Sequence, residues 1–235
     1  MAISRAHAQS VQDVSDIVND ARASGVAMVI ARSPAEDLAV AQAIEAAGGR
    51  LCDTLVYFSR TLDSPVAEPP RGVRPARGDD VDRITAIAEA AFTGYGGHYH
   101  ADSRLDRAAA DAGYVDWAGR SARTDHALVV EDAGIVVGFL TMRVGEGETE
   151  IVLNAIVPER QGRGHYRALV AAALQDSIGL GARRCTVSTQ VSNVAAQKVW
   201  VRLGFEPMRA VHTFHIWLDQ TLPQPGMSNA PSASS

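Results

Sequence analysis

Apolar positions alternate between a spacing typical of helices and one typical of strands, starting near the beginning of the chain. The first sixty residues predict a helix, a strand, a helix and a strand, at residues 11–24, 26–31, 33–47 and 51–60. The second helix is expected to begin at Ser33 and Pro34, since a capping residue followed by proline is a common first turn. These elements are too few for an independent enzyme with its own phosphate-binding loop, so residues 1–63 are predicted to form a vestigial unit.

Prolines interrupt the pattern at residues 64–72, which predicts a linker. A second and longer series of elements follows, and it defines a predicted domain at residues 73–220. It comprises a short strand at 73–76, a helix capped by Asp79 and Asp80, an irregular stretch at 93–125, a hairpin at 126–144, a strand at 149–157, and then helix, strand, helix and strand up to residue 218. The last residues, 221–235, are predicted to be a disordered tail.

The strand at 149–157 leads into the most informative stretch of the sequence. Pro158 ends the strand, a basic turn with two glycines follows, and an apolar pattern with helical spacing begins directly after it. A strand, a glycine turn and a helix aim backbone N–H groups and a helix N-terminus at a phosphate. No Gly-Lys-Ser/Thr follows the turn, and a third glycine is missing after Gly164, so neither a Walker loop nor a dinucleotide fingerprint is indicated. An ordinary turn with solvated arginines is the alternative interpretation.

Composition excludes several classes of function. The 235 residues are 46% hydrophobic and 21% charged, and the formal net charge of -5 gives no bulk electrostatic case for binding nucleic acid or an anionic membrane. No apolar run reaches transmembrane length, and the polar start is not a signal peptide. Cys52 and Cys185 lie in separate strand-like runs and predict buried reduced thiols. The sequence therefore predicts a cytoplasmic protein without a membrane partner.

Two motifs carry a resemblance to a known family. The turn, in which Gln161, Gly162, Arg163 and Gly164 are followed by His165 and Tyr166, resembles the coenzyme A loop of the GNAT superfamily of N-acetyltransferases. Residues 189–205, with Asn193 near their start and Leu203-Gly204-Phe205 at their end, resemble the family's closing segment. Within the family, the short N-terminal unit followed by a linker is similar to the layout of dTDP-fucosamine acetyltransferases. The resemblance covers residues 73–218 and implies an α/β (α+β) GNAT fold: a mixed, mostly antiparallel sheet flanked by helices, with a half-GNAT-like unit before it.

The resemblance also implies the residues of a cofactor site. Acetyl-CoA is the implied acyl donor, and no metal is implied. The pantetheine arm would pair with backbone in the strand, and the diphosphate would lie on the amides of the loop, with Arg160, Arg163 or Arg167 nearby. The cofactor-binding residues are then Ala155, Ile156, Val157, Gln161, Gly162, Arg163, Gly164, His165, Tyr166, Asn193 and Trp200. Asn193 as a plain helix cap is the alternative for that residue.

The chemistry departs from the family at two positions. Tyr166 stands where Gly or Ala is usual, and Trp200 stands where the family has its tyrosine acid. Indole donates a single N–H and has no usable proton near neutral pH, so a nearby Tyr or His, or water, has to supply the proton. Candidate catalytic residues are therefore His98, Tyr99 and His100, which lie in the stretch that lines the acceptor site in the family, together with Asn154 at the end of its strand. The spacing of His98 and His100 also suits a metal, but further ligands are not evident.

Three functions compete on this sequence. The leading one is an enzyme that moves an acetyl or other acyl group from acyl-CoA to the amine of a small molecule, with an amino sugar nucleotide favoured by the resemblance and a natural-product amine as the close alternative. The second takes its acyl group from a charged tRNA or another unusual donor, which would make tRNA the exception to an expected lack of nucleic-acid partners. The third is a non-catalytic acyl-CoA binding module. A homodimer is compatible with each.

Overall fold

The computed structural model describes residues 1–63 and 72–218 and divides them into two compact units. The first unit comprises Met1–Asp53, Gly97–Arg107 and the chain from His212 on, and the second comprises Thr54–Gly96 and Ala108–Val211. Each unit draws on separate stretches of chain, whereas the predicted domains are continuous ranges, and those ranges stay a prediction. The predicted linker, apart from Gly72, and the predicted tail lie outside the described residues.

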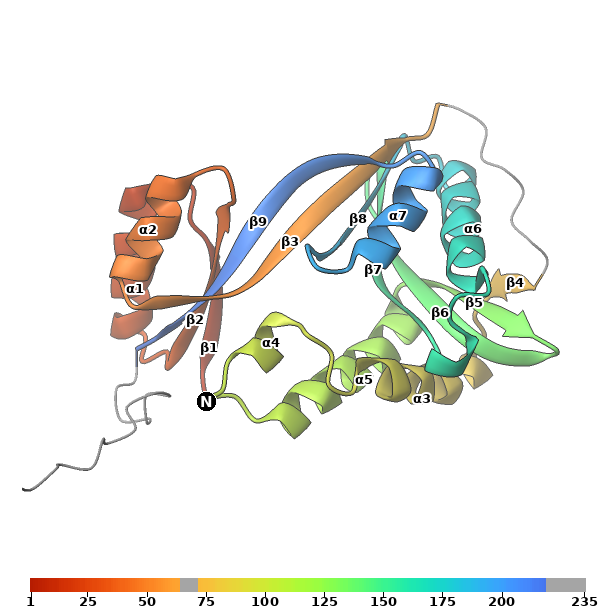
Figure 1. The fold of residues 1–235 in the computed structure, drawn as a ribbon, viewed down its shortest axis with the longest axis horizontal. Coiled ribbons are helices and arrows are strands. Elements are labelled where there is room, and N and C mark those ends of the chain that lie inside the picture. The colour runs from red at the N-terminus through yellow and green to blue at the C-terminus, as the bar shows by residue number, and fades with distance from the viewer. Residues whose placement is uncertain (64–71, 219–235) are drawn as a thin grey trace, which may run out of the picture. The chain divides into compact units, whose positions relative to one another are not determined.

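Three strands and two long helices build most of the first unit (Figure 1). Strand β1 pairs in parallel with β2, in the register Ile3↔Met28 to His7↔Arg32, and the amide of Leu218, directly after β9, donates to Ala27, directly before β2. The elements are β1 (Ile3–His7), α1 (Val11–Ala23), β2 (Met28–Pro34), α2 (Leu38–Ala46), the start of β3 (Gly49–Thr61), the short helix α4 (His98–Ala101) and the end of β9 (Glu206–Trp217).

Helices α1 and α2 cover one face of this small sheet. Their buried residues form one hydrophobic cluster with alternate residues of the strands: Ala8, Val14, Val18, Ala21, Val29, Ala31, Val40, Ala41, Ile44, Phe214 and Ile216. The N-terminus of α1 is closed by a capping box, in which Ser10 accepts from the Asp13 amide and Asp13 accepts from the Ser10 amide. Burial of one strand face against two amphipathic helices is what holds these local elements in place.

Two details of the first unit correct the sequence predictions. Strand β1 was not predicted, because three of its five residues, Ser4, Arg5 and His7, are polar and only Ile3 is a large apolar residue. The second helix does not begin at Ser33 and Pro34, since both residues belong to β2. It begins at Leu38, where the side chain of Asp37 accepts a hydrogen bond from the Val40 amide. Proline tolerates the end of a strand as well as the first turn of a helix, and the side-chain cap decided between the two.

A mixed sheet with strand order β9-β3-β8-β7-β6-β5-β4 runs through the second unit. The β7–β8 pair is parallel, whereas the β3–β8, β6–β7, β5–β6 and β4–β5 pairs are antiparallel. The predicted α/β fold, a mostly antiparallel sheet flanked by helices, is confirmed. The remaining elements are β4 (Val73–Pro75), the 3-10 turn η1 (Gly78–Asp80), α3 (Val81–Phe92), α5 (Arg107–Thr124), β5 (His126–Asp132), β6 (Ile135–Val144), β7 (Glu148–Ile156), η2 (Pro158–Arg160), α6 (His165–Gly179), β8 (Arg184–Gln190) and α7 (Val194–Arg202).

The core of the second unit is built on β6 and β7, against which both α3 and α6 pack (Figure 1). Its most buried large side chains include Phe139, Leu140, Met142, Trp200 and Phe205. Residues 93–125 were predicted to be the least regular stretch, but 18 of them form the long helix α5 from Arg107 to Thr124. Its apolar residues follow no clear stripe, so periodicity gave no signal, although a run of alanines favours a helix.

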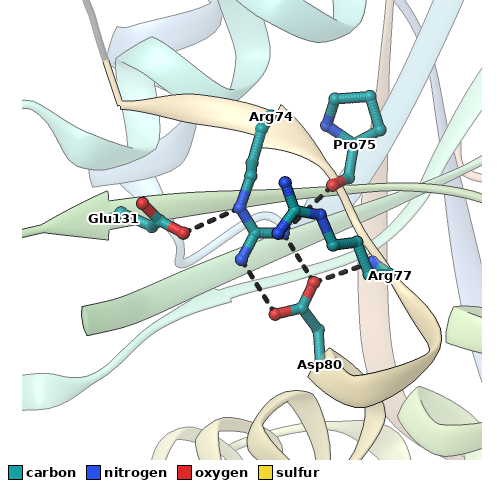
Figure 2. Close-up of polar contacts among 5 residues, drawn as sticks. All are labelled: Arg74, Pro75, Arg77, Asp80 and Glu131. Carbon is teal, nitrogen blue, oxygen red and sulfur yellow. Dashed lines mark hydrogen bonds and ion pairs between the residues drawn. The ribbon is translucent and has the colours of Figure 1, made fainter. Parts of the chain in front are cut away.

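Arg74 of β4 forms hydrogen bonds to Asp80 and Glu131 on neighbouring elements (Figure 2). Arg74 makes two hydrogen bonds to the carboxylate of Asp80, at 2.6 and 3.0 Å, and its Nε donates to Glu131 at 2.7 Å. Asp80 also accepts from the Arg77 amide at 2.7 Å. The Arg74 hydrogen bonds are the main cause that holds the pKa of Asp80 below its usual range. Asp80 does stand before α3 as predicted, but its carboxylate serves Arg74 and Arg77 and does not cap the helix.

Candidate active site

Strands β7 and β8 run side by side for only part of their length. Their parallel register comprises four pairs, from Glu148↔Arg184 to Ile151↔Val187, while β7 continues to Ile156 and β8 to Gln190. A bulge accompanies the end of the pairing, since Met142 is opposite Ile151 and Thr141 is opposite Leu153. In the part of the chain that the structure describes, the β8-side backbone of Ala155 and Ile156 thus has no ladder partner, which suits an extended ligand that adds itself as a strand.

The loop after β7 holds its glycines in a conformation that other residues avoid. Gly162 has φ +74° and Gly164 has φ +87°, and a Cβ added at either would meet no atom within 4 Å. The side chain of Gln161 donates to the Ile156 carbonyl at 3.2 Å and closes the loop onto its strand. Gly164 is the N-cap of α6, and among the described residues no side chain caps that helix. The first amides of α6 are therefore left for an anion, and the residues present fit the diphosphate of an acyl-CoA.

The charged residues around the loop are not equivalent. Arg160 donates to Asp132 at 2.7 Å, and His165 Nε2 lies 3.6 Å from the same carboxylate oxygen. Arg163 and Arg167 are exposed. Of the three arginines expected near a phosphate, Arg160 is thus already engaged by a carboxylate, which leaves Arg163 and Arg167 as the better candidates.

The two residues that depart from the family pattern, Tyr166 and Trp200, contact each other in the structure. Trp200 is 1% exposed, and its indole N–H donates to the Tyr166 hydroxyl at 2.8 Å. Burial raises the pKa of Tyr166 well above its usual range, and the indole hydrogen bond opposes that rise only in part. The phenol therefore keeps its proton at neutral pH. The sequence alone did not indicate this pairing, because 34 residues separate the two side chains.

A second tyrosine of the second unit lies close to this pair. The Tyr95 hydroxyl donates to the side-chain oxygen of Gln190, and its proximity contributes to the raised pKa of Tyr166. Tyr95 also packs edge-on against Phe92 and Tyr114. Neither Tyr95 nor Gln190 was predicted as a site residue. Gln190 lies in the predicted closing segment at residues 189–205, but no pattern links it to Tyr95, which is 95 positions away.

The two predicted asparagines have different surroundings. Asn193 caps α7, since its oxygen accepts from the Ala196 amide at 3.2 Å and its nitrogen donates to Thr189 at 3.0 Å. The plain-cap interpretation is thus correct, and contact with pantetheine stays a prediction. Asn154 is half-buried opposite Leu140, and no side-chain hydrogen bond is recorded for it within the described ranges. Its amide remains a candidate for substrate binding.

The predicted histidines and Tyr99 belong to the first unit, where they join a buried hydrogen-bonded chain. His98 Nδ1 lies 2.8 Å from His215 Nε2, and His215 Nδ1 lies 2.7 Å from Asp102 Oδ2. Trp217 and the Arg104 amide also donate to Asp102, at 2.8 and 3.0 Å. Tyr99 accepts from Arg5 at 2.6 Å. His100, on the same short helix, is half-buried. His215 and Asp102 were not predicted as site residues, since they lie 113 residues apart.

Burial and hydrogen bonding set the protonation states of His98, His215 and Asp102. Burial lowers the pKa of His215 against the opposing hydrogen bond to Asp102. Burial, with smaller contributions from His215, Arg32 and Arg5, lowers the pKa of His98 to about 3. Burial of Asp102 alone would raise its pKa, but the hydrogen bonds from Trp217 and His215 keep it below the usual range. At neutral pH the aspartate is therefore ionised and both histidines are neutral.

A metal is not favoured at this place. Cys52, Asp102 and His215 offer ligand atoms within 4.8 Å of one another. However, both ring nitrogens of His215 are already engaged in hydrogen bonds, and burial is the main cause that raises the pKa of the Cys52 thiol to about 11. A protonated thiol is a poor ligand and a poor nucleophile.

Comparison with known proteins agrees with the geometry of the second unit. The model of the acetyltransferase (GNAT) family matches residues 82–205. A Bacillus subtilis protein named spore coat polysaccharide biosynthesis protein SpsD is 27% identical over 203 residues, which are 80% of this chain and 66% of that protein. A mycothiol acetyltransferase from Pseudarthrobacter chlorophenolicus is 32% identical over 153 residues, which are 61% of this chain and 45% of that protein. The chain thus spans between about half and two thirds of the length of these relatives.

Solved structures share the fold. The crystal structure of a GCN5-related N-acetyltransferase from Sphaerobacter thermophilus superimposes with a TM-score of 0.61 over 87% of this chain and 65% of that one, at 19% identity. At this identity the likeness concerns the fold and not the substrate. Among the described residues, every helix is too short or too polar to cross a bilayer.

Proposed function

The chain belongs to the acetyltransferase (GNAT) family, and from this premise we propose that it transfers an acetyl group from acetyl-CoA to the amine of a small molecule, an amino sugar above all. The family as a whole uses acetyl-CoA, and the observation that carries the proposal here is the loop Gln161–Gly164, with left-handed glycines before an uncapped helix. The similarity to a protein named for polysaccharide biosynthesis supports a sugar as acceptor. A cytoplasmic location is part of the same proposal.

In the second unit, different residues are proposed to bind the pantetheine arm and the diphosphate of acetyl-CoA. The backbone of Ala155, Ile156 and Val157 is proposed to pair with the extended pantetheine arm, since the β7–β8 ladder ends before it. The amides from Gly162 to Tyr166 are proposed to hold the diphosphate, with Arg163 nearby. The bound thioester supplies the activated acetyl group, and holding it in line with the amine accounts for much of the rate.

The proton for the departing thiolate needs a donor, because Trp200 replaces the usual tyrosine. We assign that role to Tyr166, whose hydroxyl accepts from the Trp200 indole and keeps its own proton at neutral pH. The indole hydrogen bond favours the phenolate that forms once the proton leaves. Asn154 of the second unit remains a proposed acceptor-side residue. For His98, Tyr99 and His100 of the first unit, a catalytic role stays a prediction, with a neutral histidine suited to take a proton from an ammonium group.

Calorimetric titration of the purified chain with acetyl-CoA and with CoA is the first test. Micromolar binding of both is expected, followed by release of free thiol when amino sugar nucleotides, amino sugar phosphates and free amino sugars are added in turn. Failure of both titrations would exclude CoA as carrier and bring tRNA-borne acyl donors forward. Tight binding without thiol release from any amine would favour a non-catalytic acyl-CoA module.

A further inference from the structure

The sheet face of the first unit that lies opposite to α1 and α2 carries several polar side chains beside the buried Met28 and Ile30. Successive side chains of a strand point to opposite faces, and Ala31, Phe214 and Ile216 lie in the cluster beneath the two helices. The neighbouring positions Arg32 and Thr213 therefore face the other way. The same alternation places Arg5 of β1 and His215 of β9 on this second face as well. We call these four residues, together with His98 and Tyr99 of α4, the basic face.

Helix α4 is held against this face by the hydrogen bonds from His98 to His215 and from Arg5 to Tyr99, at 2.8 and 2.6 Å. Arg5 and Arg32 both lie close enough to His98 for their charges to act on it. The face is thus formed by β1, β2, β9 and α4 within a single unit. Its members come from both ends of the sequence and from its middle.

The positive charge of the basic face is not balanced. Arg32 is half-buried, and within the described residues no hydrogen bond or ion pair is recorded for its guanidinium group, although its carbonyl accepts from the Ala8 amide. Arg5 has only the neutral Tyr99 phenol as its recorded partner. The carboxylate of Asp102 is already shared by His215, Trp217 and the Arg104 amide. A half-buried guanidinium normally finds a carboxylate or a phosphate, because it presents five donors and always carries its charge.

A hydroxyl on the same face is also without a partner. Thr213 is 0% exposed, and its Oγ1 has no hydrogen-bond partner among the residues that the structure describes. Buried hydroxyl groups are nearly always hydrogen-bonded, so an isolated one calls for an explanation. Two unbalanced guanidinium groups and an unpartnered hydroxyl provide donors that a tetrahedral oxyanion would satisfy.

We infer that the basic face binds a phosphate group, with Arg5 and Arg32 as its cationic ligands and Thr213 as a hydroxyl donor. A nucleoside diphosphate is the class of phosphate ligand that fits the proposed function. The inference rests on that function for the identity of the ligand, whereas binding of a phosphate by the first unit is independent of it. Phosphate attracts two arginines more strongly than a single carboxylate does.

Calorimetric titration of the full chain with UDP, dTDP, inorganic pyrophosphate and uridine tests the inference. Both nucleoside diphosphates and pyrophosphate are expected to bind, and uridine is expected not to bind. The variant Arg32→Met should weaken UDP binding at least tenfold, with Arg32→Lys intermediate and circular dichroism unchanged. The matched control is Arg22→Met, which removes the same charge from exposed α1, the helix that packs on the opposite face. Its affinity for UDP should equal that of the unchanged protein.

The phosphate loop of the second unit is a competing site for the same probes, so a second variant separates the two. Gly164→Asp is expected to lose acetyl-CoA and keep UDP, whereas Arg32→Met is expected to keep acetyl-CoA and lose UDP. Loss of UDP with Gly164→Asp, equal loss with Arg22→Met and Arg32→Met, or no binding of any phosphate would overturn the inference. Failure of acetyl-CoA to bind, with UDP still bound, would instead count against the proposed function alone.

Discussion

The phosphate loop of the second unit and the basic face of the first unit are two candidate anion sites built in opposite ways. The loop is a contiguous stretch, Gln161–Gly164, between β7 and α6, and its donors are backbone amides. The basic face collects single side chains from β1, β2, α4 and β9, and its donors are guanidinium and hydroxyl groups. One site depends on backbone angles and the other on burial and charge.

The difference decides what a substitution does. In the loop, a single glycine sets the path of the chain, so its replacement moves all the amides together. On the basic face, each side chain is an independent ligand, so a replacement removes one interaction and leaves the rest. Damage to the loop should therefore be all-or-none, and damage to the basic face should be graded.

The largest effect is expected for Gly164→Asp. At φ +87° a Cβ is strained, and the added carboxylate would oppose the diphosphate, so affinity for acetyl-CoA should fall about 100-fold or more, close to 3 kcal/mol. The control is Gly181→Asp in the same unit, where φ is +78° and a Cβ also meets no atom within 4 Å. It introduces the same charge and similar strain away from the loop. Equal losses in both variants would show that strain, and not the anion site, explains the effect.

Asp102→Ala should have the next largest effect, on the stability of the first unit. It leaves His215 Nδ1 and the Trp217 indole N–H without their acceptor, and the His215 side chain is 0% exposed. A cost of about 3 kcal/mol in unfolding free energy is expected, read from urea unfolding monitored by amide exchange in the first unit. Asp116→Ala on the exposed face of α5 removes only a surface ion pair with Arg120 and should cost well under about 1 kcal/mol. Similar losses of unfolding free energy for the two variants would show that the buried hydrogen bonds of Asp102 stabilise the protein no more than a surface contact does.

This contrast also explains how much the sequence predicted. The loop, the strand before it and the helix after it were predicted, because proline, glycine and apolar spacing act over a few residues. His98 and Tyr99 were singled out as a rich cluster, yet their partners His215 and Arg5 were not, since no pattern joins residues more than 90 positions apart. Trp200 and Tyr166 were recognised as two separate departures, and only packing showed that they form a pair. Ser33 and Pro34 were wrongly predicted to begin a helix, because the strand continues through them and the side-chain cap of the helix is Asp37.

Tyr166→Phe tests whether that pair acts in the reaction or only in the fold. Loss of the acceptor for the buried Trp200 indole should cost about 2 kcal/mol of stability. If Tyr166 donates the proton, kcat should fall by a factor on the order of 100 while KM for acetyl-CoA changes little. Tyr95→Phe is the matched control, since it removes a neighbouring phenol that bonds to Gln190. A stability loss without a change in kcat would make Tyr166 a structural residue and return the role of proton donor to Tyr99 or to water.

The most gradual effect is the dependence of the stability of the first unit on pH. His98 and His215 are buried as neutral rings with lowered pKa values, about 3 for His98, whereas in the unfolded chain both titrate near their ordinary value of about 6.5. Below about pH 6.5 the unfolded state binds more protons than the folded state, so stability should be full above that pH and fall as the pH drops toward 3. Each histidine contributes a slope of at most about 1.4 kcal/mol per pH unit.

His98→Asn should therefore reduce that slope, because it removes one of the two buried neutral rings. The groups that face His98 are His215, Arg5, Arg32 and His100, and each of them disfavours a further positive charge there. If the slope survives His98→Asn undiminished, the acid sensitivity belongs to His215 and Asp102 alone. In that case His98 is charged at low cost in the folded protein, and the basic face would gain a third cation for its phosphate as the pH falls.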